Sequence, residues 1–152
     1  MKYHYLLLLS TLMCLGGCSG KSDRWTQARP PVYPVSGQVL LNDQPVEHAT
    51  ITFQPSDPAG KAGSAITDAE GRFEAQTFDP GDGLTAGTHK VAIKKIAMVD
   101  ASGNIVEEIR EPGGITEKHF LPKKYGDYET SELEITVNAD GSNELTPFEL
   151  KE

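Results

Sequence analysis

The segment Gly63–Thr77, GSAITDAEGRFEAQT, has two alternating runs of residues with a turn between them. In the second run, Phe73 and Ala75 alternate with charged and polar residues, and this period of two is typical of a half-buried strand. The segment Asp68–Gly71 combines an aspartate that can bond the backbone after it with a glycine that accepts positive φ. The sequence therefore predicts a β-hairpin here, around which the other strands are arranged.

The same alternation recurs between turns rich in Gly, Pro, Asn and Asp, and it predicts further strands at Val35–Leu41, Thr50–Gln54, Thr88–Val99, Glu132–Val137 and Glu144–Leu150. In Thr88–Val99 the apolar parity changes at Lys94-Lys95, which predicts either a bulge there or a strand that bends onto the other sheet. A helix is the alternative for this run, but no capping residue precedes it, and its Val, Ile and Thr content favours a strand. In the last segment strict alternation fails, which predicts an edge strand with a bulge at Pro147.

About seven short strands with turn-rich connections, and no convincing amphipathic helix, predict an all-β fold of the β-sandwich type. The polar stretch Asp100–Glu117 is the exception to this pattern. It contains Gly103, Pro112, Gly113 and Gly114. We interpret it as a long excursion from the sheet with a candidate small hairpin at Ile105–Arg110.

The N-terminal residues have the composition of an export signal. Lys2 precedes the apolar run Leu6–Leu15, which is shorter than the roughly 20 residues that a membrane span needs, and small residues follow. The sequence Leu15-Gly16-Gly17-Cys18 resembles the lipobox of bacterial lipoproteins, in which the cysteine is acylated and becomes the first mature residue. An ordinary signal peptide followed by a coincidental cysteine is the alternative.

These features predict three parts: a signal peptide (1–17), a lipidated cysteine with a flexible tether (18–34), and one domain (35–152). Cys14 would leave with the signal peptide, so the mature chain would hold only the acylated Cys18 and no disulfide. The net charge of −8 would become −9, because Lys2 is removed and no acid is. This balance argues against nucleic acid and against electrostatic adhesion to anionic lipid. We expect an exported protein that is held at a membrane by acyl chains and faces the periplasm or the cell surface.

Several short runs carry a resemblance to a known family. Pro34–Val39 (PVSGQV), Ala49–Phe53 (ATITF) and Thr67–Phe73 (TDAEGRF), in this order, resemble the carboxypeptidase regulatory-like domain. Leu121–Tyr125 (LPKKY), with the TSEL and NEL runs that follow it, resembles small bacterial lipoproteins built from this domain alone. The resemblance implies a prealbumin-like (transthyretin-like) Greek-key sandwich, an envelope location and a non-catalytic accessory or binding role.

No catalytic motif is present. His48, His89 and His119 are scattered, and after cleavage no free cysteine remains, so we expect neither an enzyme nor a cofactor. Two turns carry carboxylates two or three residues apart, a spacing that calcium can use, and the four candidate ligands are Asp79, Asp82, Asp68 and Glu70. Asp and Gly are also the ordinary residues of turns, and we favour the turn interpretation over a metal site.

Exposed aromatic rings would point to sugar binding, and the candidates are Tyr125, Tyr128 and Trp25. Trp25 has the alternative of resting at the bilayer interface or on the domain, because it lies close to the predicted anchor. Tyr125 has the alternative of closing the end of the core. The sequence therefore predicts a structural or interaction lipoprotein with envelope partners, and the alternative is a carbohydrate-binding module of the cell envelope.

Overall fold

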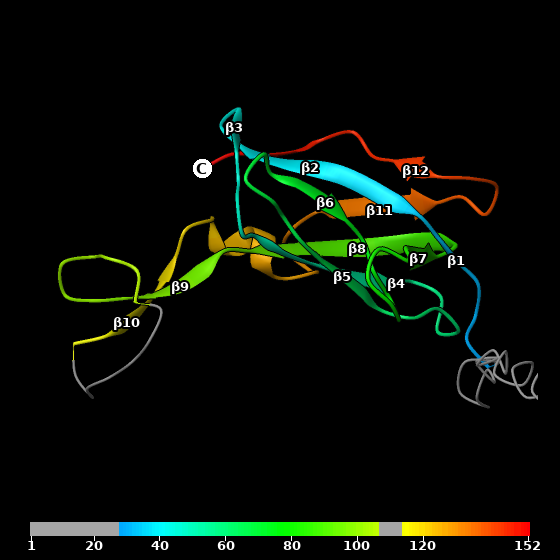
Figure 1. Ribbon diagram of the computed structural model, residues 1–152, viewed down its shortest axis with the longest axis horizontal. Helices are drawn as coiled ribbons and strands as arrows, with labels where there is room; N and C mark the ends of the chain where they lie inside the picture. Colours follow the sequence, from blue (N-terminus) through cyan, green and yellow to red (C-terminus); the bar gives the residue numbers. More distant parts are fainter. Residues whose placement is uncertain (1–27, 107–113) are drawn as a thin grey trace, which may run out of the picture.

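The computed structural model describes residues 28–106 and 114–152 (Figure 1). The predicted signal peptide (1–17), Cys18, Trp25 and most of the candidate hairpin at 105–110 lie outside the described residues. The described part contains thirteen short β-strands and one 3₁₀-helix, η1 (Lys123–Gly126), and no α-helix. The strands are thus shorter and more numerous than the seven predicted.

Four antiparallel strands form the first sheet. Their order is β11 (Leu133–Val137), β8 (Gly87–Lys94), β4 (Thr50–Pro55) and β5 (Gly63–Ile66). Alternate residues of these strands are buried, as the period of two predicts. The buried apolar side chains of this face include Ile51, Phe53, Ala65, Val91, Ile93, Ile135 and Val137.

The second sheet is built on one long strand, β2 (Val35–Leu41). Two short strands, β3 (Gln44–Pro45) and β6 (Arg72–Glu74), pair with β2 in the antiparallel sense. The chain returns at its C-terminal end as β12 (Asn143–Glu144) and β13 (Phe148–Leu150), which pair with β2 in parallel. The segment that contains Pro147 separates β12 from β13, so the predicted single edge strand with a bulge is two short strands. The parallel pairing was not foreseen.

The core lies between these two sheets. Phe53 of the first sheet contacts Phe73 of the second, with ring centroids 6.1 Å apart, and Phe73 stacks on Phe148 at the same distance. Gly37 leaves room for the ring of Phe73, because a Cβ at Gly37 would lie 2.8 Å from its Cζ. Two sheets packed face to face in this way are an all-β sandwich, which confirms the predicted fold class.

The predicted hairpin at 63–77 is wrong in its pairing and right in its alternation. Ala65 and Phe73 are both buried, but β5 belongs to the first sheet and β6 to the second. The turn between them is therefore a corner that carries the chain from one sheet to the other. The two runs pair only at Ser64 and Gln76. Alternation specifies which side chains face the core, and it does not specify the neighbouring strand.

The strand breaks at Lys94-Lys95, where the parity change predicts it, but it does not bend onto the other sheet. β8 ends at Lys94, and β9 (Ile96–Val99) pairs with β10 (Thr116–His119) in a separate two-stranded ribbon. Figure 1 shows this ribbon extending beyond one end of the sandwich. At the opposite end, β1 (Val32–Tyr33) pairs with β7 (Leu84–Thr85), so the last residues of the predicted tether lie against the sandwich.

Thr67 is a buried polar residue beside the corner between the sheets, and a substitution there tests the fold. Its side chain is 2% exposed, and its hydroxyl donates to Val46 O (2.6 Å) and accepts from Ala49 N (2.8 Å). Thr67→Val would leave both backbone groups unpaired, and we expect the free energy of unfolding to fall by about 3 kcal/mol in chemical denaturation. Thr67→Ser keeps the hydroxyl and should cost only about 1 kcal/mol for the lost methyl group. Equal losses in the two variants would contradict this role of the hydroxyl.

Candidate functional site

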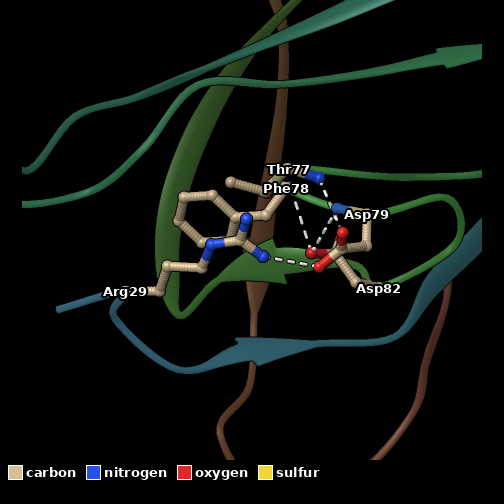
Figure 2. A network of polar contacts seen from close by, with 5 residues as sticks. All are labelled: Arg29, Thr77, Phe78, Asp79 and Asp82. Carbon is tan, nitrogen blue, oxygen red and sulfur yellow. Dashed lines mark hydrogen bonds and ion pairs between the residues drawn. The ribbon is translucent and has the colours of Figure 1, made fainter. Parts of the chain in front are cut away.

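Two of the predicted metal ligands, Asp79 and Asp82, lie in one loop that joins β6 to β7 (Figure 2). The carboxylate of Asp82 accepts three backbone hydrogen bonds, from Thr77 N (2.7 Å), Phe78 N (3.0 Å) and Asp79 N (3.0 Å). Its two oxygens thus join the end of the loop to the backbone at its start. Asp82 is therefore a structural residue of the turn, as the turn interpretation predicts.

Asp79 is engaged by a residue from the other side of the loop. Arg29 Nη1 donates to Asp79 Oδ2 at 2.5 Å, and the guanidinium lies 4.8 Å from the ring centroid of Phe78 (Figure 2). This ion pair and cation–π contact hold the chain just before β1 against the loop. The described end of the predicted tether is thus attached to the domain at three points: Arg29, β1 and the hydrogen bond from Asn143 N to Pro34 O (2.8 Å).

The pKa of Asp82 is lowered from its ordinary value. Burial by itself would raise the pKa, but the backbone hydrogen bonds from Thr77, Asp79 and Phe78 lower it, and the positive charge of Arg29 adds to their effect. The three hydrogen bonds and the charge of Arg29 all favour the ionised carboxylate. The loop geometry therefore depends on the charge of Asp82.

The second pair of carboxylates has the same structural use. Asp68 Oδ1 accepts from Glu70 N (3.0 Å) and from Arg72 N (2.8 Å), which closes the corner between the sheets. Glu70 is exposed. Across residues 28–106 and 114–152, no three His, Cys, Asp or Glu side chains gather as a metal-holding set. The arrangement of these four carboxylates favours the turn interpretation at both loops.

The predicted aromatic candidates do not come together on the described surface. Tyr125 is 8% exposed and lies in the core; its hydroxyl accepts from Lys151 N (3.0 Å) and donates to Lys151 O (3.2 Å). It closes the end of the core, which was its alternative role. Tyr128 is half-buried, and Trp25 lies outside the described residues. A stacking platform for a sugar therefore finds no support in the two tyrosines.

The three histidines also remain apart. His89, on β8, is fully buried and shares a 2.8 Å hydrogen bond between Nε2 and Thr85 O. His48 lies in an exposed turn, and His119 lies on β10, 3.1 Å from a carboxylate oxygen of Glu117. Within the part of the chain that the structure describes, none of these three histidines belongs to a group of three side chains that could hold a metal ion.

Sequence reasoning missed an open groove of about 740 Å³ on the outer face of the second sheet. Its floor carries two rows of polar side chains: Glu144, Ser36 and Glu74 are cross-strand neighbours in the first, and Gln38 and Arg72 pair in the second. Alternation places these residues on the outward face of their strands. The pairing of β12 with β2, which completes the first row, has no local sequence signal.

The chain matches no protein-family model and no curated protein sequence. Among solved structures, a 9R-lipoxygenase from Cyanothece PCC8801 is similar to 81% of this chain, with a TM-score of 0.39 and 14% sequence identity. This chain spans 17% of the length of that lipoxygenase chain. A likeness of this size carries no inference about family or activity. Within residues 28–106 and 114–152, no helix is long and apolar enough to cross a membrane.

The charge of Asp82 gives a pH-dependent prediction. The amide oxygen of Asp82→Asn can accept from at most two of the three backbone N–H groups, and its NH₂ group would face the third, so we expect a loss of about 1 kcal/mol in the free energy of unfolding near neutral pH. Because the folded pKa lies below the ordinary value of 3.8, the contribution of the carboxylate is complete above that value and is lost as the pH falls through the folded pKa. The difference between wild type and variant should therefore shrink below about pH 4.

Denaturation series at several pH values measure this difference. Asp43→Asn is the matched control, because Asp43 is exposed in a turn, and it should leave stability nearly unchanged at every pH. A gap between wild type and Asp82→Asn that stays constant down to strongly acidic pH would show that the charge of Asp82 does not hold the loop.

Proposed function

We propose that this protein is a non-catalytic lipoprotein of the cell envelope, anchored by an acylated Cys18, that acts as an interaction module. The sequence Leu15-Gly16-Gly17-Cys18 supports the anchor. The interaction role is supported by how the polar side chains are used. In the candidate loops and in the core, polar side chains form hydrogen bonds with the backbone, as Asp82, Asp68 and Thr67 do. Other polar side chains, such as those of Gln38 and Arg72, line an open groove, which suits recognition.

The observation that carries this proposal is the direction in which the chain enters the sandwich. The strand β1 lies at one end of the long axis of the molecule, and the β9–β10 ribbon extends from the other (Figure 1). Ten residues separate Cys18 from Ala28, and such a segment spans at most about 35 Å when fully extended. An anchor at Cys18 would keep the β1 end near the membrane and present the ribbon away from it.

The family proposal is the carboxypeptidase regulatory-like domain with a prealbumin-like Greek-key sandwich. It is supported by the runs at 34–39, 49–53 and 67–73, and the two-layer all-β architecture is compatible with it. Membership would give the domain an accessory or binding role, in agreement with the interaction module proposed here. Fold alone does not supply function, so the role is tested directly.

The anchor is tested by the intact mass of protein extracted from the membrane fraction of a bacterial host. We expect a mature species that begins at Cys18 and carries the added mass of acyl chains. Cys18→Ser should remove the acyl mass and release the protein from the membrane, because several acyl chains on one cysteine provide the attachment. Cys14→Ser is the matched control, because it changes the other cysteine, and it should leave the mature mass unchanged.

A soluble species that is cleaved elsewhere and carries no lipid would overturn the anchor. If the anchor holds, cross-linking from the anchored form should capture envelope proteins in the wild type and lose them when Cys18→Ser releases the protein. Identical cross-linked partners from the anchored and released forms would show that membrane attachment is not needed for the interaction.

A carbohydrate-binding module is the second candidate, and the groove on the outer face of the second sheet favours it. Gln38, Arg72 and Glu144 line this groove and offer planar polar groups of the kind that hydrogen-bond sugar hydroxyls. On an array of envelope glycans, we expect a bound glycan to be lost in Arg72→Met, which keeps the aliphatic length and removes the donors. Lys61→Met, outside the groove, should bind as the wild type does. No binding by the wild type would contradict this candidate.

A further inference from the structure

Half of the lysines of this acidic chain gather at one place. The chain has ten lysines and a net charge of −8, and five lysines lie where the β9–β10 ribbon joins the sandwich. We name this region the lysine surface and define it, with the neighbouring histidine, as Lys94, Lys95, Lys118, His119, Lys123 and Lys124. A hollow of about 200 Å³, lined in part by Lys94, Lys95, His119 and Lys123, lies within it.

The aliphatic stems of these lysines are packed, which holds their ammonium groups in place. The stem of Lys94 passes over Gly126, where an added Cβ would lie 3.0 Å from its Cε. The ammonium groups of Lys118 and Lys95 lie 5.1 and 5.8 Å from the ring centroid of Phe120. Lys124 lies 4.8 Å from the ring centroid of Tyr125. Stems that pack on the protein while the charged heads stay in water give a patch of defined position.

The described surroundings of this patch hold fewer acids than lysines. Among the described residues, no carboxylate lies within ion-pair distance of any of the five lysines. Two described acids are close: Asp127 lines the hollow, and Glu117 lies 3.1 Å from His119. Counted over the described residues, five lysines against these two acids leave the region with a net positive charge on a negative protein.

Two exposed apolar side chains lie on the same ribbon. Ile96 and Met98 are 42% and 37% exposed, and they lie on one face of β9 with His119 and Glu117 as cross-strand neighbours, whereas Lys118 pairs with Ala97 on the other face. A positive patch with exposed aliphatic side chains on the same ribbon suits a partner that offers both carboxylates and apolar groups. A chain of acidic and aliphatic amino acids has this combination.

We propose that the lysine surface binds an acidic polypeptide segment of an envelope partner, an inference that rests on the proposed interaction role and names its partner class. Lysines act as point charges and lack the planar guanidinium group with which arginine binds a phosphate through two hydrogen bonds. The surface is therefore not built for specific recognition of a phosphate group. Two ammonium groups lie within 6 Å of the ring centroid of Phe120, where they compete with a sugar for that ring. The surface also lies at the end opposite β1, away from the proposed membrane anchor.

The test measures binding of a fluorescein-labelled peptide of Glu and Leu residues to the mature chain in detergent, by fluorescence anisotropy. The double variant Lys94→Gln/Lys123→Gln should weaken binding about tenfold, the effect of two exposed ion pairs. The double variant Lys61→Gln/Lys90→Gln removes the same charge elsewhere and should change affinity less than about twofold. Raising the salt concentration from about 0.05 M to about 0.5 M should weaken wild-type binding. Melting temperatures confirm that all variants are folded.

Equal losses in the two double variants would overturn the proposal, because binding would then follow net charge and not this surface. Absence of peptide binding would also overturn it, as would polygalacturonate or phosphatidylglycerol micelles that bind with the same lysine dependence in place of the peptide. The titration uses purified protein in detergent, so its result does not depend on how the protein is anchored. Failure here and failure of the Cys18→Ser experiment are therefore distinguishable.

Discussion

The packing of the two sheets across Phe53, Phe73 and Phe148 is the constraint on which the rest of this structure depends. The stacked rings need Gly37 on the central strand, because any Cβ there would collide with Phe73. Side chains of the described strands fill the space between the sheets, so the proposed recognition sites lie on the outer faces and at the ends. The groove over the second sheet and the lysine surface at the ribbon are such places.

The short strands of a sandwich require many turns, and the acidic residues of this chain serve them. Asp82 and Asp68 accept the backbone N–H groups that a tight loop leaves without strand partners. The same residue types at the same spacing also describe a calcium loop. Sequence spacing does not separate the two cases, because the difference lies in whether the carboxylate oxygens point to backbone N–H groups or to an open position. At Asp82 the carboxylate oxygens accept hydrogen bonds from three backbone N–H groups.

Alternation predicted the strand bounds well where both flanking turns are marked by Gly, Pro, Asn or Asp, as at Val35–Leu41 and in the run that ends at Val137. It also located the break at Lys94-Lys95, because a change of parity is a local property. It failed for strand pairing at β5 and β6, which belong to different sheets, since pairing is decided by contacts between distant residues. The groove and the lysine surface were missed for the same reason: residues near 36, 72 and 144, or near 94, 118 and 123, become neighbours only through the pairing of distant strands.

The lysine surface is not explained by the stability of the sandwich. Exposed lysines without carboxylate partners contribute little to folding, and like charges that lie close together oppose it. The stem of Lys94 covers Gly126, but an uncharged side chain of the same length would cover it equally well. What the ammonium groups add is a field at one end of the molecule, opposite in sign to that of the whole chain. Such a field orients an approaching partner before contact, which would suit the proposed interaction module if it is anchored at its other end.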